Sequence, residues 1–109
     1  MVYDEKLAER MTKLLKGKRG VTEKKMFGGI AFLLDGKMFC GVIKNDLVVR
    51  IDPGYYYKAI TKPNVRPFDF SGKPMKGFIY VGPEGCKKEK VLSEWINLGI
   101  DYVNSLHKK

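Results

Sequence analysis

The chain has 109 residues and a net charge of +9, with 44% of its residues hydrophobic and 30% charged. This length suits one domain with a single core, and the composition excludes a wholly disordered chain. We therefore expect a single domain over residues 1–109. The longest apolar run, residues 30–34, is too short to span a membrane. Asp4, Glu5 and Lys6 occupy the place where a signal peptide would be apolar, so we expect a cytoplasmic protein.

The excess positive charge is spread along the chain. Residues 1–25 and 26–82 each carry eight lysines and arginines against four acids, while residues 83–109 carry five against four. Such a diffuse field attracts polyanions weakly, and it equally serves solubility. The candidate anion or nucleic-acid surface consists of Lys24, Lys25, Arg50, Arg66, Lys73 and Lys76. Nearby aromatic residues could stack on a base: Phe27, Tyr55, Tyr56 and Tyr57.

Residue types that carry catalysis are scarce. Cys40 and Cys86 are too far apart for a CxxC motif, and His107 stands two residues from the C-terminus as a solvated side chain. We expect Cys40 to be buried, whereas Lys87 and Lys88 would mildly favour a thiolate at Cys86. No catalytic triad, metal-ligand set or paired carboxylates can be assembled. We therefore predict no enzyme activity, no metal and no cofactor.

Hydrophobic periodicity predicts a helix, then a strand meander. Apolar residues recur at helical spacing over residues 4–16, and glycines follow at 17 and 20. After Gly29 the period changes to two. The turn signals Asp35-Gly36 and Asn45-Asp46 then separate three antiparallel strands. The predicted strands cover residues 30–34, 37–44 and 47–51.

The second half alternates helix and strand. Asp52 followed by Pro53 predicts an N-cap and a short helix to about residue 61. Two further strands, 66–70 and 75–81, would form a hairpin around residues 71–74. The last helix is predicted from apolar residues spaced three and four apart between residues 92 and 106, with Gly99 on the buried side for close packing.

This order predicts an α+β fold of two layers: helix, three-strand meander, helix, β-hairpin, helix, with the helices on one face of an antiparallel sheet. Alternation places apolar residues on both faces of the sheet. In the second strand, Met38 and Cys40 should share one face with Val42, and Phe39 should lie on the other with Ile43. An apolar face that the helices leave uncovered predicts a partner, and we expect a homodimer. The alternative is shielding by loops and lysine stems.

The pair Gly28-Gly29, preceded by Lys24 and Lys25, could indicate a phosphate cradle. Phosphate loops, however, draw their field from a helix that follows, and here a strand follows. We therefore interpret the two glycines as a backbone device, either a positive φ or a close approach, between a basic linker and the first strand.

Four stretches resemble the N-terminal domain of the TfoX/Sxy family of competence regulators. They are KKMFGGIAF, GKMFCGVIKNDLVVRID, PFDFSGKPMKGFIYV and LSEWINLGIDYVNSL, and together they cover nearly the whole chain in order. The resemblance implies an α+β fold similar to the type III secretion chaperones. In two-domain members a helical domain follows, and those proteins activate DNA-uptake genes with the cyclic-AMP receptor protein. Here we expect a stand-alone copy of the domain.

The resemblance carries over architecture and no catalytic residues. The matching positions are Met26, Phe27, Gly28, Gly29, Gly36, Lys37, Met38, Phe39, Arg50, Pro67, Phe68, Gly72, Lys73, Pro74, Met75, Gly77 and Trp95. We therefore predict a non-enzymatic regulatory module that docks on another protein, with the transcription machinery as the candidate partner. The alternative is weak direct binding of DNA through the basic surface.

Overall fold

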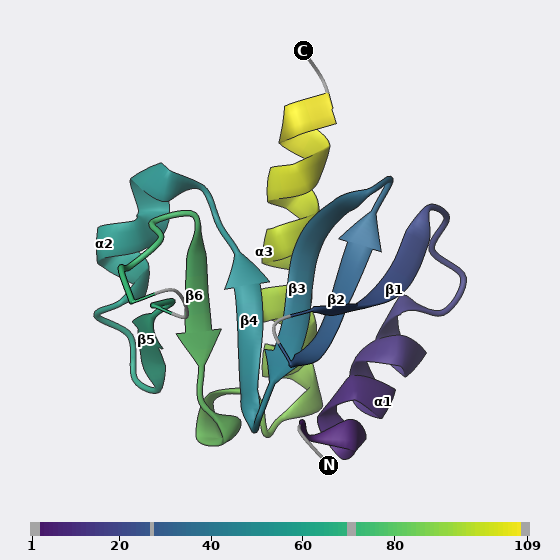
Figure 1. Ribbon diagram of the computed structural model, residues 1–109, viewed down its shortest axis with the longest axis horizontal. Helices are drawn as coiled ribbons and strands as arrows, with labels where there is room; N and C mark the ends of the chain where they lie inside the picture. The colour runs from purple at the N-terminus through teal and green to yellow at the C-terminus, as the bar shows by residue number, and fades with distance from the viewer. Residues whose placement is uncertain (1–2, 27, 70–71, 108–109) are drawn as a thin grey trace.

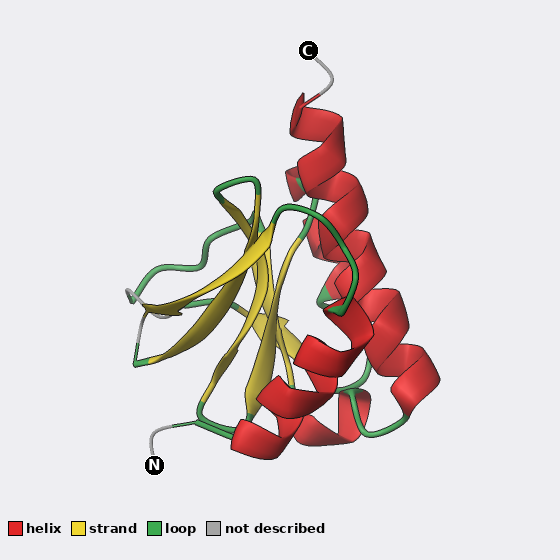
Figure 2. Cartoon of the chain, turned by 90° about the vertical axis from the view of Figure 1, so that its right-hand side faces the viewer, coloured by secondary structure: helices red, strands yellow, loops and turns green. Residues whose placement is uncertain are grey.

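The chain folds into one open antiparallel sheet with its helices on one face, as Figures 1 and 2 show. This computed structural model describes residues 3–26, 28–69 and 72–107. The strands are β1 (Val21–Met26), β2 (Gly29–Leu34), β3 (Lys37–Ile43), β4 (Asp46–Arg50), β5 (Val65–Pro67) and β6 (Phe78–Val81). The α-helices are α1 (Glu5–Leu15), α2 (Tyr56–Ala59) and α3 (Glu89–His107), and 3-10 turns η1 (Pro53–Tyr55) and η2 (Pro83–Gly85) precede α2 and α3. The predicted α+β class is confirmed.

The strands lie in the order β1-β2-β3-β4-β6-β5, and every neighbouring pair is antiparallel. The meander runs through tight turns, one of which holds Asp35 and Gly36 at φ values of 51° and 86°. These left-handed conformations are the ones that a two-residue hairpin requires. The next turn is one residue earlier than predicted, because Lys44 takes the positive φ of 54° and Asp46 already belongs to β4.

The region expected to be a basic linker is a strand. Residues Val21–Met26 pair with β2 in a continuous register from Val21 opposite Leu34 to Met26 opposite Gly29. Most of its side chains are exposed, so the segment has little apolar alternation to identify it. Backbone pairing with β2, and not burial of its own side chains, therefore holds this segment as a strand.

Helix α1 is positioned by its first turn. The Asp4 carboxylate accepts hydrogen bonds from the backbone N–H groups of Lys6 and Leu7, at 3.0 and 3.2 Å. The Asp4 N–H donates to the Lys44 carbonyl at 2.7 Å, which ties the helix start to the end of β3. Asp52 caps the turn before α2 in the same way, through a 2.8 Å bond from the Gly54 N–H. The predicted cap at Asp52 is confirmed, whereas α1 begins one residue later than predicted, with Asp4 as its cap.

A β-bulge changes which residues face the helices. Phe32 pairs with Cys40 while Leu33 pairs with Met38, so Phe39 is the extra residue on β3. The bulge turns Phe39 to the helix side beside Cys40, where both are fully buried, and leaves Met38 on the opposite face. The predicted alternation along β3 was wrong at these positions, because a regular period of two cannot contain an inserted residue.

The core lies between the sheet and the helices. Helix α3 packs across β3 and β4, and Figure 2 shows it beside the sheet together with α1. At Gly99 the helix comes so close to β3 that a Cβ atom would collide with the Phe39 carbonyl oxygen. The close packing predicted for Gly99 is confirmed.

The other face of the sheet is partly covered by the chain itself. Phe68, just after β5, lies over Phe78 and Tyr80, with ring centroids 5.5 and 4.9 Å apart. These rings form a second apolar cluster with Ile43 and Val48, and Val48 is fully buried. The predicted strands 66–70 and 75–81 are shorter than expected, and Phe70 and Ser71 are outside the described residues. An entirely uncovered face was therefore an incorrect premise for the dimer prediction.

Gly28 and Gly29 meet two different demands at the β1–β2 hairpin. Gly28 has a φ of +76° with open space where a Cβ would lie, whereas a Cβ on Gly29 would collide with the backbone carbonyl oxygen of Val42. The interpretation as a backbone device is confirmed at both positions. The hairpin joins two strands, and Phe27 lies outside the described residues.

The positive φ at Gly28 and the close backbone contact at Gly29 predict that alanine lowers the unfolding free energy by different amounts at the two positions. Gly28→Ala should lose about 1 kcal/mol of unfolding free energy, the cost of a left-handed residue, and Gly28→Asn should lose less. Gly29→Ala should lose roughly 2–3 kcal/mol, because the β3 backbone must move. Urea unfolding checks this, with Gly77→Ala as the control, since its Cβ meets nothing within 4 Å. Equal stabilities for the Gly28 and Gly29 variants would contradict the assignment.

Candidate functional site

The predicted basic residues do not converge on one patch. Lys24 and Lys25 lie on β1 at one edge of the sheet, and their side chains point to opposite faces. Arg66 lies on β5 at the other edge. Lys73 and Lys76 belong to the segment between β5 and β6, and Arg50 ends β4. The predicted surface therefore divides, because sequence proximity says nothing about which edge of the sheet a strand occupies.

Arg66 is engaged within the fold. Its guanidinium forms a 2.9 Å ion pair with the Asp46 carboxylate and lies 5.0 Å from the centroid of the Tyr80 ring. The hydrogen bond to Asp46 raises the pKa of Arg66 further, and burial raises the pKa of Tyr80. A cation already paired with a carboxylate has less to offer an anionic ligand, so Arg66 is structural in this arrangement.

A different group of residues gathers where β4 ends and β6 begins. The Arg50 guanidinium carbon lies 5.7 Å from the ring centroid of Phe78 on β6 and 5.5 Å from that of Tyr102 on α3. Ile51 donates a 2.9 Å hydrogen bond to the Gly77 carbonyl, which holds the two chain segments together. Arg50 therefore links the end of the sheet to α3.

The same end of the molecule carries an exposed aromatic and an exposed cation. The Lys76 ammonium lies 5.0 Å from the centroid of the Tyr57 ring. The hydrogen bond with Tyr57, and next their coulombic interaction, raise the pKa of Lys76. Tyr57 is 62% exposed and Met75 is 42% exposed, and they are the large hydrophobic residues that stand out to solvent in the described chain. We call this group the cation–aromatic surface: Arg50, Tyr57, Met75, Lys76, Phe78 and Tyr102.

Sequence reasoning found only part of this surface. It named Arg50 and Lys76 as cations and Tyr57 as a stacking partner, but it included Tyr102 only in the apolar stripe of the last helix. Nothing in the sequence connects residue 102 with residue 50, because the contact depends on how α3 crosses the sheet. The cation–π pairs were therefore not predictable from spacing.

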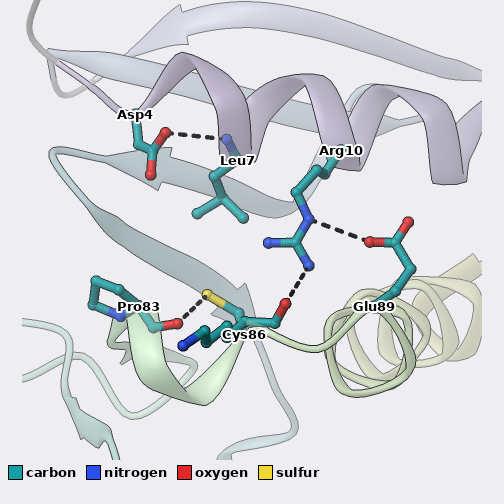
Figure 3. Close-up of polar contacts among 7 residues, drawn as sticks. Asp4, Leu7, Arg10, Pro83, Cys86 and Glu89 are labelled. Atoms are coloured by element: carbon teal, nitrogen blue, oxygen red, sulfur yellow. Dashed lines mark hydrogen bonds and ion pairs between the residues drawn. The ribbon is translucent and has the colours of Figure 1, made fainter.

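Both cysteines are buried thiols. Cys40 is fully buried, and desolvation raises its pKa well above the ordinary value. Cys86 donates hydrogen bonds to the Gly82 carbonyl at 3.5 Å and to the Pro83 carbonyl at 3.7 Å, and Figure 3 shows the second of these. Burial raises the pKa of the Cys86 thiol as well. The mild thiolate character expected at Cys86 was wrong, since desolvation raises the pKa of its thiol more than Arg10 lowers it.

Polar contacts fasten neighbouring segments to α3, and one of them is made by Trp95, a matching position. The Trp95 indole N–H donates to the Gly85 carbonyl at 3.3 Å, fastening η2 against α3. Arg10 of α1 binds Glu89 at 3.2 Å and the Lys87 carbonyl at 3.0 Å, so α1 is tied to the start of α3 (Figure 3). Within the described residues, no three His, Cys, Asp or Glu side chains group as a metal site would require.

The profile of the TfoX N-terminal domain matches residues 13–102, most of the 109-residue chain. The chain belongs to the TfoX N-terminal domain family. The match spans the sheet, α2 and most of α3, including every residue of the cation–aromatic surface. A comparison with curated proteins gives no match. Among the described helices of this TfoX N-terminal domain, none has the length and apolar character needed to span a bilayer.

Proposed function

We propose that this TfoX N-terminal domain is a non-enzymatic regulatory module that binds an acidic protein partner through the cation–aromatic surface. The observation that carries the proposal is the placement of Arg50 5.7 and 5.5 Å from the rings of Phe78 and Tyr102, together with the exposed pair formed by Tyr57 of α2 and Lys76 of the segment before β6. A component of the transcription machinery is the candidate partner, in keeping with a regulatory family.

The composition of this surface supports a protein partner. Tyrosine, arginine, methionine and phenylalanine are the residues enriched in protein interfaces and their energetic centres. Tyr57 and Met75 offer apolar area that the fold leaves in solvent, so burying it under a partner is favourable. The rings beside Arg50 also hold its side chain in place, which reduces the entropy lost on binding.

The charge of the domain supports an acidic partner. The chain carries +9 overall, and Arg50 and Lys76 contribute two cations to this surface. The planar guanidinium of Arg50 suits a carboxylate, and ring stacking leaves the nitrogen edge of such a group available. An acidic segment with one apolar anchor would therefore match both features of the surface.

Capture at native expression level tests this proposal. A tagged domain should retain a partner that Tyr57→Ala and Lys76→Glu lose by tenfold or more, the scale of an interface centre. Lys16→Glu is the matched control, because it makes the same charge change on an exposed residue that follows α1, outside the cation–aromatic surface. Recovery of the tagged domain alone, or equal retention by Lys76→Glu and Lys16→Glu, would contradict the proposal.

The exposed ring of Tyr57 beside Lys76 favours a second candidate, weak binding of single-stranded or duplex DNA at the same surface. Stacking of a base on an exposed ring and contact of cations with phosphates are the two terms of such binding. The affinity should then fall steeply as salt increases, and Tyr57→Ala should weaken the single-stranded complex about tenfold. Fluorescence anisotropy with labelled oligonucleotides measures both effects. No binding at low salt, or no change in Tyr57→Ala, would exclude this candidate.

A further inference from the structure

Strand β1 leaves one side of its backbone without a neighbour in the sheet. It is an edge strand of six residues that pairs with β2 alone, and its register with β2 is uninterrupted. The opposite edge, β5, has three residues and includes Pro67, which has no N–H to donate. An edge that is long and regular is the one that can accept another strand.

The hydrogen-bonding positions of β1 can be assigned. The Gly20 carbonyl accepts from the Asp35 N–H at 2.9 Å, and Met26 faces Gly29 across the two-residue turn. Bonded and non-bonded pairs alternate along an antiparallel ladder, so the even-numbered residues of β1 bond to β2. The backbone groups of Val21, Glu23 and Lys25 therefore point to the open edge.

The side chains make this edge complementary to itself. Thr22, Glu23, Lys24 and Lys25 are exposed. A two-fold axis through Lys24 would place Glu23 opposite Lys25 of a second copy, and Lys25 opposite its Glu23. These are also the residues whose backbone groups are open, so the charged pairs and the hydrogen-bonded pairs coincide.

Neighbouring registers lack this match. An axis through Glu23 would set two glutamates face to face, and an axis through Lys25 would set two lysines face to face. With the axis at Lys24, the one like-charged pair is Lys24 with the Lys24 of the second copy, on the other face of the sheet. Their long stems allow the ammonium groups to turn apart into solvent.

We propose that β1 pairs with β1 of a second copy, antiparallel around a two-fold axis at Lys24, and so joins two sheets into one. The interface is isologous, as in most homodimers. This agrees with the homodimer expected from the sequence but moves it from the sheet face to the sheet edge. The inference does not depend on the cation–aromatic surface, which contains no residue of β1.

A symmetric disulfide tests the register directly. Directly opposed residues in a non-hydrogen-bonded pair have Cα atoms about 4.5 Å apart, within the range a disulfide spans. Lys24→Cys should therefore form a disulfide-linked dimer under mild oxidation. The native thiols will not interfere, since Cys40 and Cys86 are buried, at 0% and 2% exposure.

Thr22→Cys is the matched control, because residue 22 is equally exposed but would face Met26 of the second copy. Its two thiol-bearing residues would be about 13 Å apart along the strands, so cross-linking should be at least about tenfold slower than for Lys24→Cys. Equal rates for the two variants would overturn the proposal.

Exchanging the charges of Glu23 and Lys25 provides a second test of the proposed dimer. By sedimentation of the unmodified chain, Glu23→Lys should weaken dimerisation roughly tenfold, and adding Lys25→Glu should restore it. Because both substituted positions are exposed, the melting temperature of each variant can be measured to check that the variant still folds. A monomeric wild type over the whole concentration range would overturn the proposal, as would a monomer whose β1 edge instead binds an extended polyglutamate peptide.

Discussion

The contact between Gly99 of α3 and the Phe39 carbonyl of β3 is the constraint on which the remaining structure depends. A helix can approach a strand this closely only where it has no side chain, and the carbonyl that Gly99 meets belongs to Phe39, the extra residue of the β-bulge. The approach sets where α3 crosses the sheet. That crossing in turn brings Tyr102, one turn further along the helix, to Arg50 at the end of β4.

The bulge also determines which side chains each face of the sheet carries. With Phe39 turned toward the helices, the core holds an additional large ring, and the opposite face carries Met38 and the small Gly41. The segment after β5 then covers part of that second face with Phe68. The two partner surfaces that we propose lie at different places in the fold: the cation–aromatic surface at the end of β4 and the open edge of β1.

The sequence predicted the elements whose stability comes from their own side chains. Helices α1 and α3 show a clear apolar stripe, and the Asp35-Gly36 turn has residues that accept a positive φ. Strand β1 was missed because its side chains are exposed and its order comes from the β2 backbone. The bulge was missed because an inserted residue is visible only through its partner strand. The candidate site was predicted in part, since the cations were named but their neighbours depend on how α3 crosses the sheet.

The unfolding free energy of Gly99→Ala tests the central contact most directly. In a helix exposed to solvent, replacing glycine by alanine raises the unfolding free energy by about 1 kcal/mol through helix propensity. Without close packing at Gly99, the substitution should therefore stabilise the domain. The account predicts a loss of roughly 2 kcal/mol or more, because the Cβ must displace the Phe39 backbone or push α3 away. Asn97→Ala on the exposed side of α3 should change stability by less than about 0.5 kcal/mol. A Gly99→Ala domain that is as stable as the wild type, or more stable, would contradict the account.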